Sequence, residues 1–349
     1  MFTIHFPVKL NPADRSDTHG NLRNCQPCGK EENDSITKLL SPNASDAARF
    51  VVNSTSQKIH NADNSRLKTP QKRKSALITG ATSGIGKAFA FEFARKGYDL
   101  IITGRRQQEI YAVADQLKKD YKIRVTVLTI DLSVHDDLAR LIKLVQKKKN
   151  IEILVNNAGF GLSEKFYEDQ VNNQLKMLKV HVTAPLVLIH RIIPQMIKQG
   201  SGTIINVASL AAYTPTPDNA MYTGTKSFLI NFTESLHMEL HNYGIRVQCL
   251  CPGLTHSDFH NKLNKIKLPV SGHRFIWMNP AEVVNYSLNC LEKDKIICIP
   301  GASNRAMVGI ISIMPRRFYY FLMNRLTHKH QSCEKIPRCT SEHKIRQAV

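Results

Sequence analysis

The chain has 349 residues, a formal net charge of +20 and 42% hydrophobic residues. This length accommodates one large α/β domain with extensions, or two small domains. The excess charge is spread along the chain, with 30 basic against 19 acidic residues in 73–315. A nucleic-acid binder concentrates its cations on one element with aromatic residues nearby, so we expect no nucleic-acid partner. The charge fits anionic ligands or an anionic membrane surface, and equally a generally basic protein.

The ends of the chain are more polar than its centre. Residues 1–72 show little periodicity, and we predict a flexible polar extension there. The N-terminus lacks the apolar core of a signal peptide, and we find no apolar run approaching the ~20 residues that span a bilayer. We therefore expect a cytoplasmic protein.

Eight cysteines are scattered through the chain. Four stand in apolar strand or helix contexts and are predicted to be buried free thiols: Cys249, Cys251, Cys290 and Cys298. Cys25 and Cys28 form a lone CxxC pair, which is only half a zinc site. We expect no bound metal and a reducing compartment.

A strand, a glycine-rich loop and a helix open the folded region. Ala76–Thr79 is apolar and strand-like, and Lys87–Lys96 has helical spacing. This context predicts that the loop binds the phosphates of a dinucleotide, because free N–H groups at a helix start attract anions. The predicted binding residues are Gly80, Thr82, Ser83, Gly84, Ile85 and Gly86.

The second strand, Asp99–Thr103, ends in Gly104-Arg105-Arg106. A site that prefers NAD places an acidic residue here for the ribose 2′-hydroxyl, whereas this chain offers Arg105 with Arg106 beside it. An arginine matches a 2′-phosphate in charge and geometry, so NADP(H) is the predicted cofactor. The alternative is that both arginines merely begin the next helix.

Two further strands are expected at Arg124–Ile130 and Ile151–Val155, with helices running to about Lys119 and over Val134–Lys148. The first of these strands ends at Asp131 and Leu132, where an adenine would lie. The second is followed by small residues that we expect beneath the nicotinamide ribose: Asn157, Ala158 and Gly159. A plain turn explains the same residues.

The segment Gln170–Lys198 has helical character with Pro185 and Pro194 in its path. It is followed by a strand-like run over Gly202–Ala208, and then by Ser209. Tyr222 and Lys226 come next, one turn apart on a predicted helix over Ala220–Tyr243.

These three side chains form a candidate catalytic set. A phenol has an unperturbed pKa of about 10, and a neighbouring ammonium is expected to lower it toward working pH. Tyr222 would then exchange a proton with a developing alkoxide or an alcohol, while Ser209 holds the carbonyl oxygen. That chemistry needs a hydride carrier.

Beyond a strand at Ile245–Leu250, the stretch 256–278 has the character of a loop that covers the substrate. A helix at Asn279–Leu291 and a strand at Lys295–Ile299 follow. The segment 307–326 is apolar but interrupted by Pro315-Arg316-Arg317, so it would lie on a membrane, cover the pocket or pack on its own domain.

Together the motifs resemble the short-chain dehydrogenase/reductase family over Lys74–Gly301. Thr79–Gly86 is similar to its TGxxxGxG loop, and Asn156–Gly159 to its NNAG motif. Its active-site residues fall on Ser209, Tyr222 and Lys226, and its PG motif on Pro252 and Gly253, with Thr255 beside the cofactor. The resemblance implies a doubly wound parallel α/β sheet of Rossmann type in one domain, 73–304, followed by an amphipathic segment and basic tail, 305–349.

One departure from the family pattern concerns the catalytic asparagine, which the family uses to hold a water in a proton relay. That place reads Val180-His181-Val182 here. A histidine also holds water and titrates near neutrality, so His181 is a candidate catalytic residue. A smaller departure is Ser257, where the family often has threonine.

The resemblance implies an NADP-dependent oxidoreductase that reduces a small-molecule ketone or aldehyde, with branch-level similarity to enzymes of acyl chains and lipophilic ketones. It also implies a homodimer or homotetramer paired through two long helices, and 307–326 offers peripheral membrane contact. The alternative is a non-catalytic nucleotide-binding scaffold or sensor on the same fold. An epimerase or dehydratase shares the Tyr-Lys pair but normally needs a longer C-terminal half.

Overall fold

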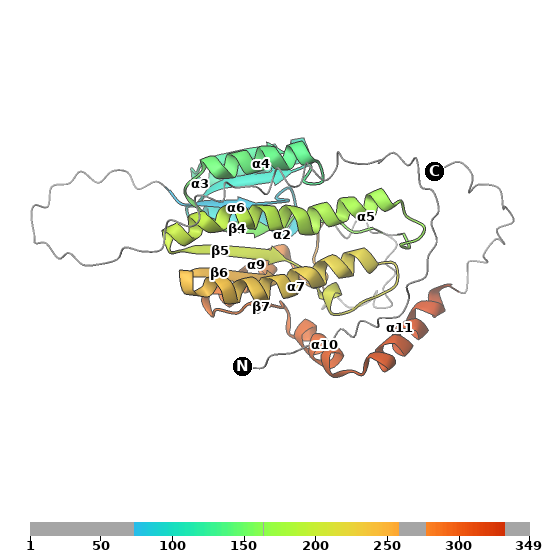
Figure 1. Cartoon of the computed structure of the whole chain (residues 1–349). Helices are drawn as coiled ribbons and strands as arrows, with labels where there is room; N and C mark the ends of the chain where they lie inside the picture. The colour runs from blue at the N-terminus through green and yellow to red at the C-terminus, as the bar shows by residue number, and fades with distance from the viewer. Residues whose placement is uncertain (1–72, 163, 258–276, 332–349) are drawn as a thin grey trace, which may run out of the picture. The chain divides into compact units, whose positions relative to one another are not determined.

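The computed structural model describes residues 73–162, 164–257 and 277–331, which form a parallel sheet with helices on both faces (Figure 1). Within this part of the chain the strand order is β3-β2-β1-β4-β5-β6-β7. The strands are Ser75–Ile78 (β1), Asp99–Gly104 (β2), Val125–Thr129 (β3), Ile151–Asn156 (β4), Gly202–Val207 (β5), Ile245–Leu250 (β6) and Ile297–Cys298 (β7). The order reverses between β1 and β4, the switch point where doubly wound sheets bind their ligands. The predicted fold class is therefore confirmed.

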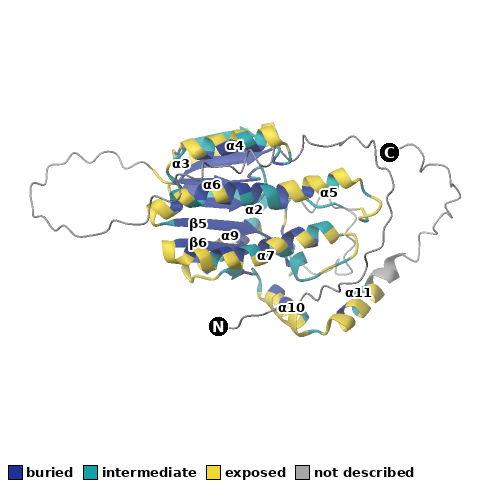
Figure 2. Ribbon diagram, in the orientation of Figure 1, coloured by how far each residue is buried: buried dark blue, intermediate teal, exposed yellow. Residues whose placement is uncertain are grey.

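The helices form a layer on each face of the sheet. One face is covered by α2 (Gly84–Arg95), α3 (Gln107–Tyr121) and α9 (Pro280–Glu292). The other is covered by α4 (His135–Lys147), α6 (Ala184–Gln199) and α7 (Ala220–Leu240). Successive strand side chains point to opposite faces, so strands covered on both sides are mostly apolar, and the buried residues in Figure 2 follow these strands.

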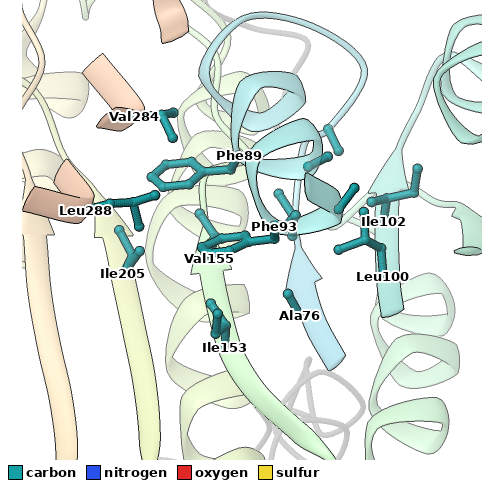
Figure 3. Packing of buried hydrophobic residues seen from close by; sticks show 14 of the residues in the cluster. Ala76, Phe89, Phe93, Leu100, Ile102, Ile153, Val155, Ile205, Val284 and Leu288 are labelled. Atoms are coloured by element: carbon teal, nitrogen blue, oxygen red, sulfur yellow. The ribbon is translucent and has the colours of Figure 1, made fainter. Parts of the chain in front are cut away.

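The core on the α2 face is built around two aromatic rings. Phe89 and Phe93 lie one turn apart on α2, with ring centroids 5.7 Å apart. Figure 3 shows them over Val155 of β4 and beside Leu288 of α9. The start of α9 is fixed by a capping box, in which the Asn279 side chain accepts from the Ala281 N–H at 3.0 Å. This packing holds α2, and with it the glycine loop, against the sheet.

The predicted helix over Gln170–Lys198 is a continuous helical run of α5 (Val171–Leu178), a π-helical turn (Lys179–Thr183) and α6. The expectation that no segment could span a bilayer was wrong for this run, because Val171–Gln199 is long and apolar enough by length and composition. Its most apolar window is 56% buried inside the fold, as in a core helix. The π-helical turn is the local distortion that carries His181.

Several further expectations can be compared with the structure. The strand expected at Lys295–Ile299 is shorter, and 307–326 falls into two helices, α10 (Ala302–Ile313) and α11 (Arg316–Gln331), because Pro315 interrupts the helical backbone. All four cysteines predicted to be buried free thiols are so. The N-terminal extension, Cys25, Cys28 and most of the expected substrate loop lie outside the described residues.

Candidate active site

The glycine loop and the NNAG loop are held together at the switch point by Thr79. Its Oγ1 accepts from the backbone N–H of Asn157 at 3.0 Å and of Ala158 at 3.1 Å. In return, the Asn157 side-chain amide donates to the carbonyl oxygens of Thr79 and Gly80, both at 3.0 Å. Thr79 was not among the predicted site residues, although it is the first residue of the TGxxxGxG motif.

Glycine is required in this loop because neighbouring atoms lie too close for a side chain. Gly80 has φ +69° and a Cβ there would lie 2.8 Å from the Ala158 Cα. A Cβ on Gly86 would collide with the Gly80 carbonyl oxygen, so helix α2 can pack closely on the loop only with glycine at this position. Gly84 has φ +55° and faces Ser257, whose Cβ would lie 2.8 Å away from an added Cβ. The loop therefore brings backbone N–H groups at the start of α2 to the edge of the cleft.

The two arginines after β2 have different partners. Arg106 Nη2 donates to Thr82 Oγ1 at 3.0 Å and to Ser83 Oγ at 2.9 Å, so its guanidinium lies on the glycine loop. Arg105 instead lies 3.6 Å from the Asp131 carboxylate and 5.7 Å from the centroid of the Phe160 ring. Arg106, which the sequence analysis placed second, is thus the arginine fixed at the phosphate loop, while Arg105 faces the adenine side.

Gly104, the last residue of β2, lies against the side chain of Thr82 in the glycine loop. A Cβ at this position would lie 2.5 Å from Cγ2 of Thr82, so any larger residue here requires the Thr82 side chain to move.

Asp131 stands at the end of β3, as predicted, and is held as a carboxylate. It accepts from the N–H and the hydroxyl of Ser133 at 2.9 and 2.8 Å. Burial alone would raise its pKa, but the hydrogen bonds from Ser133 and the nearby Arg105 together lower it.

Ser209 leaves the end of β5 and faces Tyr222. Its Oγ accepts from the Ala211 N–H at 3.2 Å, and the next residue, Leu210, donates its N–H to the Pro252 carbonyl oxygen at 3.1 Å. The PG turn thus supports the serine. Burial raises the pKa of the Tyr222 phenol above its ordinary value, and a hydrogen bond with Ser209 opposes this shift.

Lys226 is buried below Tyr222. Its Nζ donates to the Val207 carbonyl oxygen at 2.8 Å and lies 5.7 Å from the centroid of the Tyr222 ring. Burial lowers the pKa of this ammonium to about 8. The expected lowering of the Tyr222 pKa by Lys226 is therefore not found, because burial disfavours charge on both groups.

His181 is tied to both sides of the site. Its Nε2 accepts from the Phe160 N–H at 3.1 Å, which leaves Nδ1 as the protonated nitrogen, 3.0 Å from Thr225 Oγ1. Thr225 in turn donates to the Tyr222 carbonyl oxygen at 2.9 Å. Burial and the neighbouring Lys226 lower the pKa of His181 well below its usual range. Both ring nitrogens bond to protein groups, so the expected water-holding role does not fit this arrangement.

One cleft of about 450 Å³ joins these groups. It is lined by every predicted cofactor residue except Gly86: Gly80, Thr82, Ser83, Gly84, Ile85, Arg105, Arg106, Asp131, Leu132, Asn157, Ala158, Gly159, Tyr222, Lys226, Pro252, Gly253 and Thr255. Ser209 lines it as well, whereas His181 lies behind it. Phe160, which also lines the cleft and stacks near Arg105, was missed because an aromatic residue after NNAG carries no signal of its own.

A doubly wound sheet with a dinucleotide cleft and a Ser/Tyr/Lys set defines a class of oxidoreductase. Residues 74–267 match the family model for short chain dehydrogenases, and the chain belongs to that family. An uncharacterized oxidoreductase of Staphylococcus epidermidis is 34% identical over 184 residues, which is 52% of this chain and 78% of that relative. The very-long-chain 3-oxoacyl-CoA reductase of Mus musculus is 29% identical over 265 residues, 74% of this chain and 80% of that relative.

Solved structures show the same relationship. A short-chain dehydrogenase of Sphingobium yanoikuyae in complex with NADPH is 25% identical with a TM-score of 0.61, over 77% of this chain and all of that one. The bulky-bulky ketone specific alcohol dehydrogenase of Comamonas testosteroni is 26% identical with a TM-score of 0.59, over 77% of this chain and 99% of that one. The protein is therefore an oxidoreductase of this family, with neighbours that bind NADPH and small-molecule substrates.

Proposed function

We propose that the protein is an NADPH-dependent reductase that converts a ketone or aldehyde into an alcohol. The observation that carries this proposal is the convergence of Ser209, Tyr222 and Lys226 on the cleft that the glycine loop lines. A hydroxyl, a phenol and an ammonium in one cleft supply what the reduction of a carbonyl group requires from the protein.

The cleft fits a nicotinamide dinucleotide with a 2′-phosphate. The start of α2 carries no acidic residue in its first turn, so its N–H groups are available to a pyrophosphate. Arg106, held by Thr82 and Ser83, would pair with the 2′-phosphate, and the end of β2 carries Gly104 in place of the acidic residue that binds the ribose 2′-hydroxyl of NAD. NADPH, when bound, supplies the hydride.

The protein's own residues would orient the carbonyl group and move one proton. The Ser209 hydroxyl would donate a hydrogen bond to the carbonyl oxygen, and the Tyr222 O–H would protonate that oxygen as it becomes an alkoxide. Because burial raises the Tyr222 pKa, the phenol keeps its proton at neutral pH. This favours reduction over alcohol oxidation, which would need the phenolate.

We further propose a lipophilic or acyl-chain carbonyl substrate. The lining of the cleft includes the apolar side chains of Phe160, Leu162 and Val180. Support also comes from the similar proteins whose names give a very-long-chain 3-oxoacyl-CoA and bulky ketones as substrates.

The test is a titration of the purified full chain with NADPH and with NADH, followed by nicotinamide fluorescence, and then by turnover on a panel of ketones and fatty carbonyl compounds. Tyr222→Phe should retain NADPH binding and lose about 10²–10⁴-fold in turnover. Equal binding of both cofactors, or full turnover by Tyr222→Phe, would contradict the proposal.

The second candidate is a non-catalytic nucleotide-binding scaffold or sensor, and the observation that favours it is His181. In place of the family's asparagine stands a side chain whose nitrogens both bond to protein groups. NADPH binding without turnover on any carbonyl compound, in the wild type as in Tyr222→Phe, would favour this function.

We also propose a cytoplasmic location and assembly into a homodimer or homotetramer through the long helices. Two large apolar side chains exposed on α7 support the assembly: Phe228 is 38% exposed and Met238 is 66% exposed. Light scattering on the wild type and on Phe228→Ser/Met238→Ser tests it, and a monomeric wild type would overturn it.

A further inference from the structure

The helices α10 and α11 form a cationic segment without acidic residues. No Asp or Glu occurs in the sequence from Ala302 to Gln331, while four arginines fall in its first 24 positions: Arg305, Arg316, Arg317 and Arg325. Arg305 is used inside the fold, because it donates to the Tyr286 hydroxyl at 2.8 Å. The other three belong to α11 and give this helix a positive charge.

Large apolar side chains of the same two helices are exposed. Ile310 and Ile313 of α10 are 59% and 85% exposed, and Phe318 and Phe321 of α11 are 53% and 58% exposed. Figure 2 shows most of α10 and the first part of α11 in the colour of exposed residues. Exposed isoleucine and phenylalanine side chains gathered on neighbouring helices are typical of a surface that binds a partner.

The two kinds of side chain share one face of α11. Phe318, Phe321 and Arg325 follow one another at spacings of three and four residues, which places them on one side of the helix. The Arg325 guanidinium lies 6.0 Å from the centroid of the Phe321 ring. Tyr319 points elsewhere: it is buried and donates its hydroxyl to the Pro215 carbonyl oxygen at 2.8 Å.

We propose that α10 and α11 bind the surface of an anionic phospholipid bilayer, with Ile310, Ile313, Phe318 and Phe321 entering the headgroup boundary and the α11 arginines pairing with lipid phosphates. Apolar side chains interspersed with cations match such an interface. The helices have 12 and 16 residues, fewer than a bilayer span requires, so they would lie along the membrane. A second copy of this protein is disfavoured as the partner of this surface. Pairing the surface with itself would bring the arginines of the two copies together, with no carboxylate on either helix to neutralise them.

Tyr319 ties this surface to a loop of the candidate active site. Pro215, which holds Tyr319, belongs to the loop that leads from Ser209 to Tyr222. A bilayer bound to α11 would therefore lie close to the loop that joins Ser209 to Tyr222, the two residues that the proposed function places at the carbonyl oxygen. The link to a lipophilic substrate rests on the proposed reductase function, whereas membrane binding itself does not.

The test is sedimentation of the full chain with vesicles of phosphatidylcholine alone and of phosphatidylcholine mixed with phosphatidylglycerol, at low and high salt. We expect binding to the mixed vesicles, weakened by salt. Arg316→Gln/Arg317→Gln should lower the partition coefficient roughly 25-fold, at about fivefold for each charge. The matched control is Arg95→Gln/Arg140→Gln, which removes two exposed charges from α2 and α4 and should leave binding unchanged.

A second variant removes the apolar contribution. Phe318→Ser/Phe321→Ser should abolish sedimentation with mixed vesicles while NADPH fluorescence, which reports the fold, is retained. Equal binding to neutral and anionic vesicles, an equal effect of the control pair, or oligomerisation through α11 in place of vesicle binding would overturn the proposal. If the wild type reduced no carbonyl compound, the proposed function would be refuted, but the vesicle-binding result would still support the membrane proposal.

Discussion

Replacing His181 tests whether this residue positions the site or carries protons through it. The side chain is 1% exposed and joins the loop after NNAG to the catalytic helix through Phe160 and Thr225. Two changes separate the roles: His181→Ala removes both bonds, and His181→Asn restores the residue type of the family pattern with a shorter reach.

The size of the effect follows from what each change leaves behind. Alanine leaves the Phe160 N–H without its acceptor, which lowers the free energy of unfolding by about 1–3 kcal/mol. It also opens a void the size of an imidazole, and the two effects together are expected to lower the free energy of unfolding by about 3 kcal/mol. Asparagine can replace one of the two hydrogen bonds, so His181→Asn is expected to lower the free energy of unfolding by about 1–2 kcal/mol. Thermal melts should then fall by roughly 6–12 °C for alanine and less for asparagine.

The activity assay is a pH profile of kcat/KM with NADPH and a reducible ketone. Because His181 stays neutral and both its nitrogens are bonded, the wild type should show no ionisation near pH 6.5, the ordinary imidazole pKa. His181→Asn should lower the rate without changing the shape of the profile. A limb near pH 6.5 that disappears in His181→Asn would refute the reasoning and restore the proton-carrying role.

Three further outcomes follow from the same structure. Arg106→Ala should weaken NADPH binding roughly 10- to 150-fold, because one charged hydrogen-bond partner is lost, and should leave NADH binding unchanged. Arg105→Ala is the matched control, with a smaller expected effect on NADPH binding. A larger effect of Arg105→Ala would contradict the assignment of Arg106 to the 2′-phosphate. Burial lowers the pKa of Lys226 in the folded protein from 10.5 to about 8. The buried ammonium therefore lowers the free energy of unfolding fully below pH 8, and this loss disappears as pH rises toward 10.5. The stability advantage of Lys226→Met over the wild type should therefore shrink by about 3 kcal/mol between pH 7 and pH 10.5, measured by urea unfolding, and a constant difference would show that the ammonium is not buried in solution. Asn279→Ala removes the capping box of α9 and should cost about 1 kcal/mol in thermal or urea unfolding; Asn231→Ala in the middle of α7 is the control, and an equal loss there would argue against the cap.

The fold could be predicted from the sequence because the patterns that define its strands, helices and loops each lie within a short stretch of the chain. Alternation and apolar runs marked the strands, and the glycine spacing placed the loop between β1 and α2. The glycines of that loop are confirmed in their contacts, since Gly80 and Gly86 meet backbone atoms that leave no room for a side chain. The start of α9 was placed at Asn279 in the same way, from adjacent residues, although the Glu282 half of its capping box was not anticipated.

What the sequence left undetermined depends on residues far apart in the chain. Whether Arg105 or Arg106 lies on the glycine loop depends on how the backbone leaves β2, and spacing does not record that direction. The two bonds of His181 join positions 160, 181 and 225, which meet only in the folded chain. Burial is likewise a property of the fold, and it reverses the expected direction of the Tyr222 pKa shift.

The ionisation of Tyr222 and Lys226 together bears on the direction of the reaction. Burial disfavours both the phenolate and the ammonium, so the uncharged phenol with its proton is the stable form of Tyr222 near neutral pH. Lys226, with a pKa of about 8, still carries its proton for most molecules at pH 7 and is held by the Val207 carbonyl oxygen. In the proposed reaction, this state of Tyr222 can give a proton to an alkoxide, whereas taking a proton from an alcohol first requires the phenolate. The ratio of reduction to oxidation rates should therefore fall as pH rises.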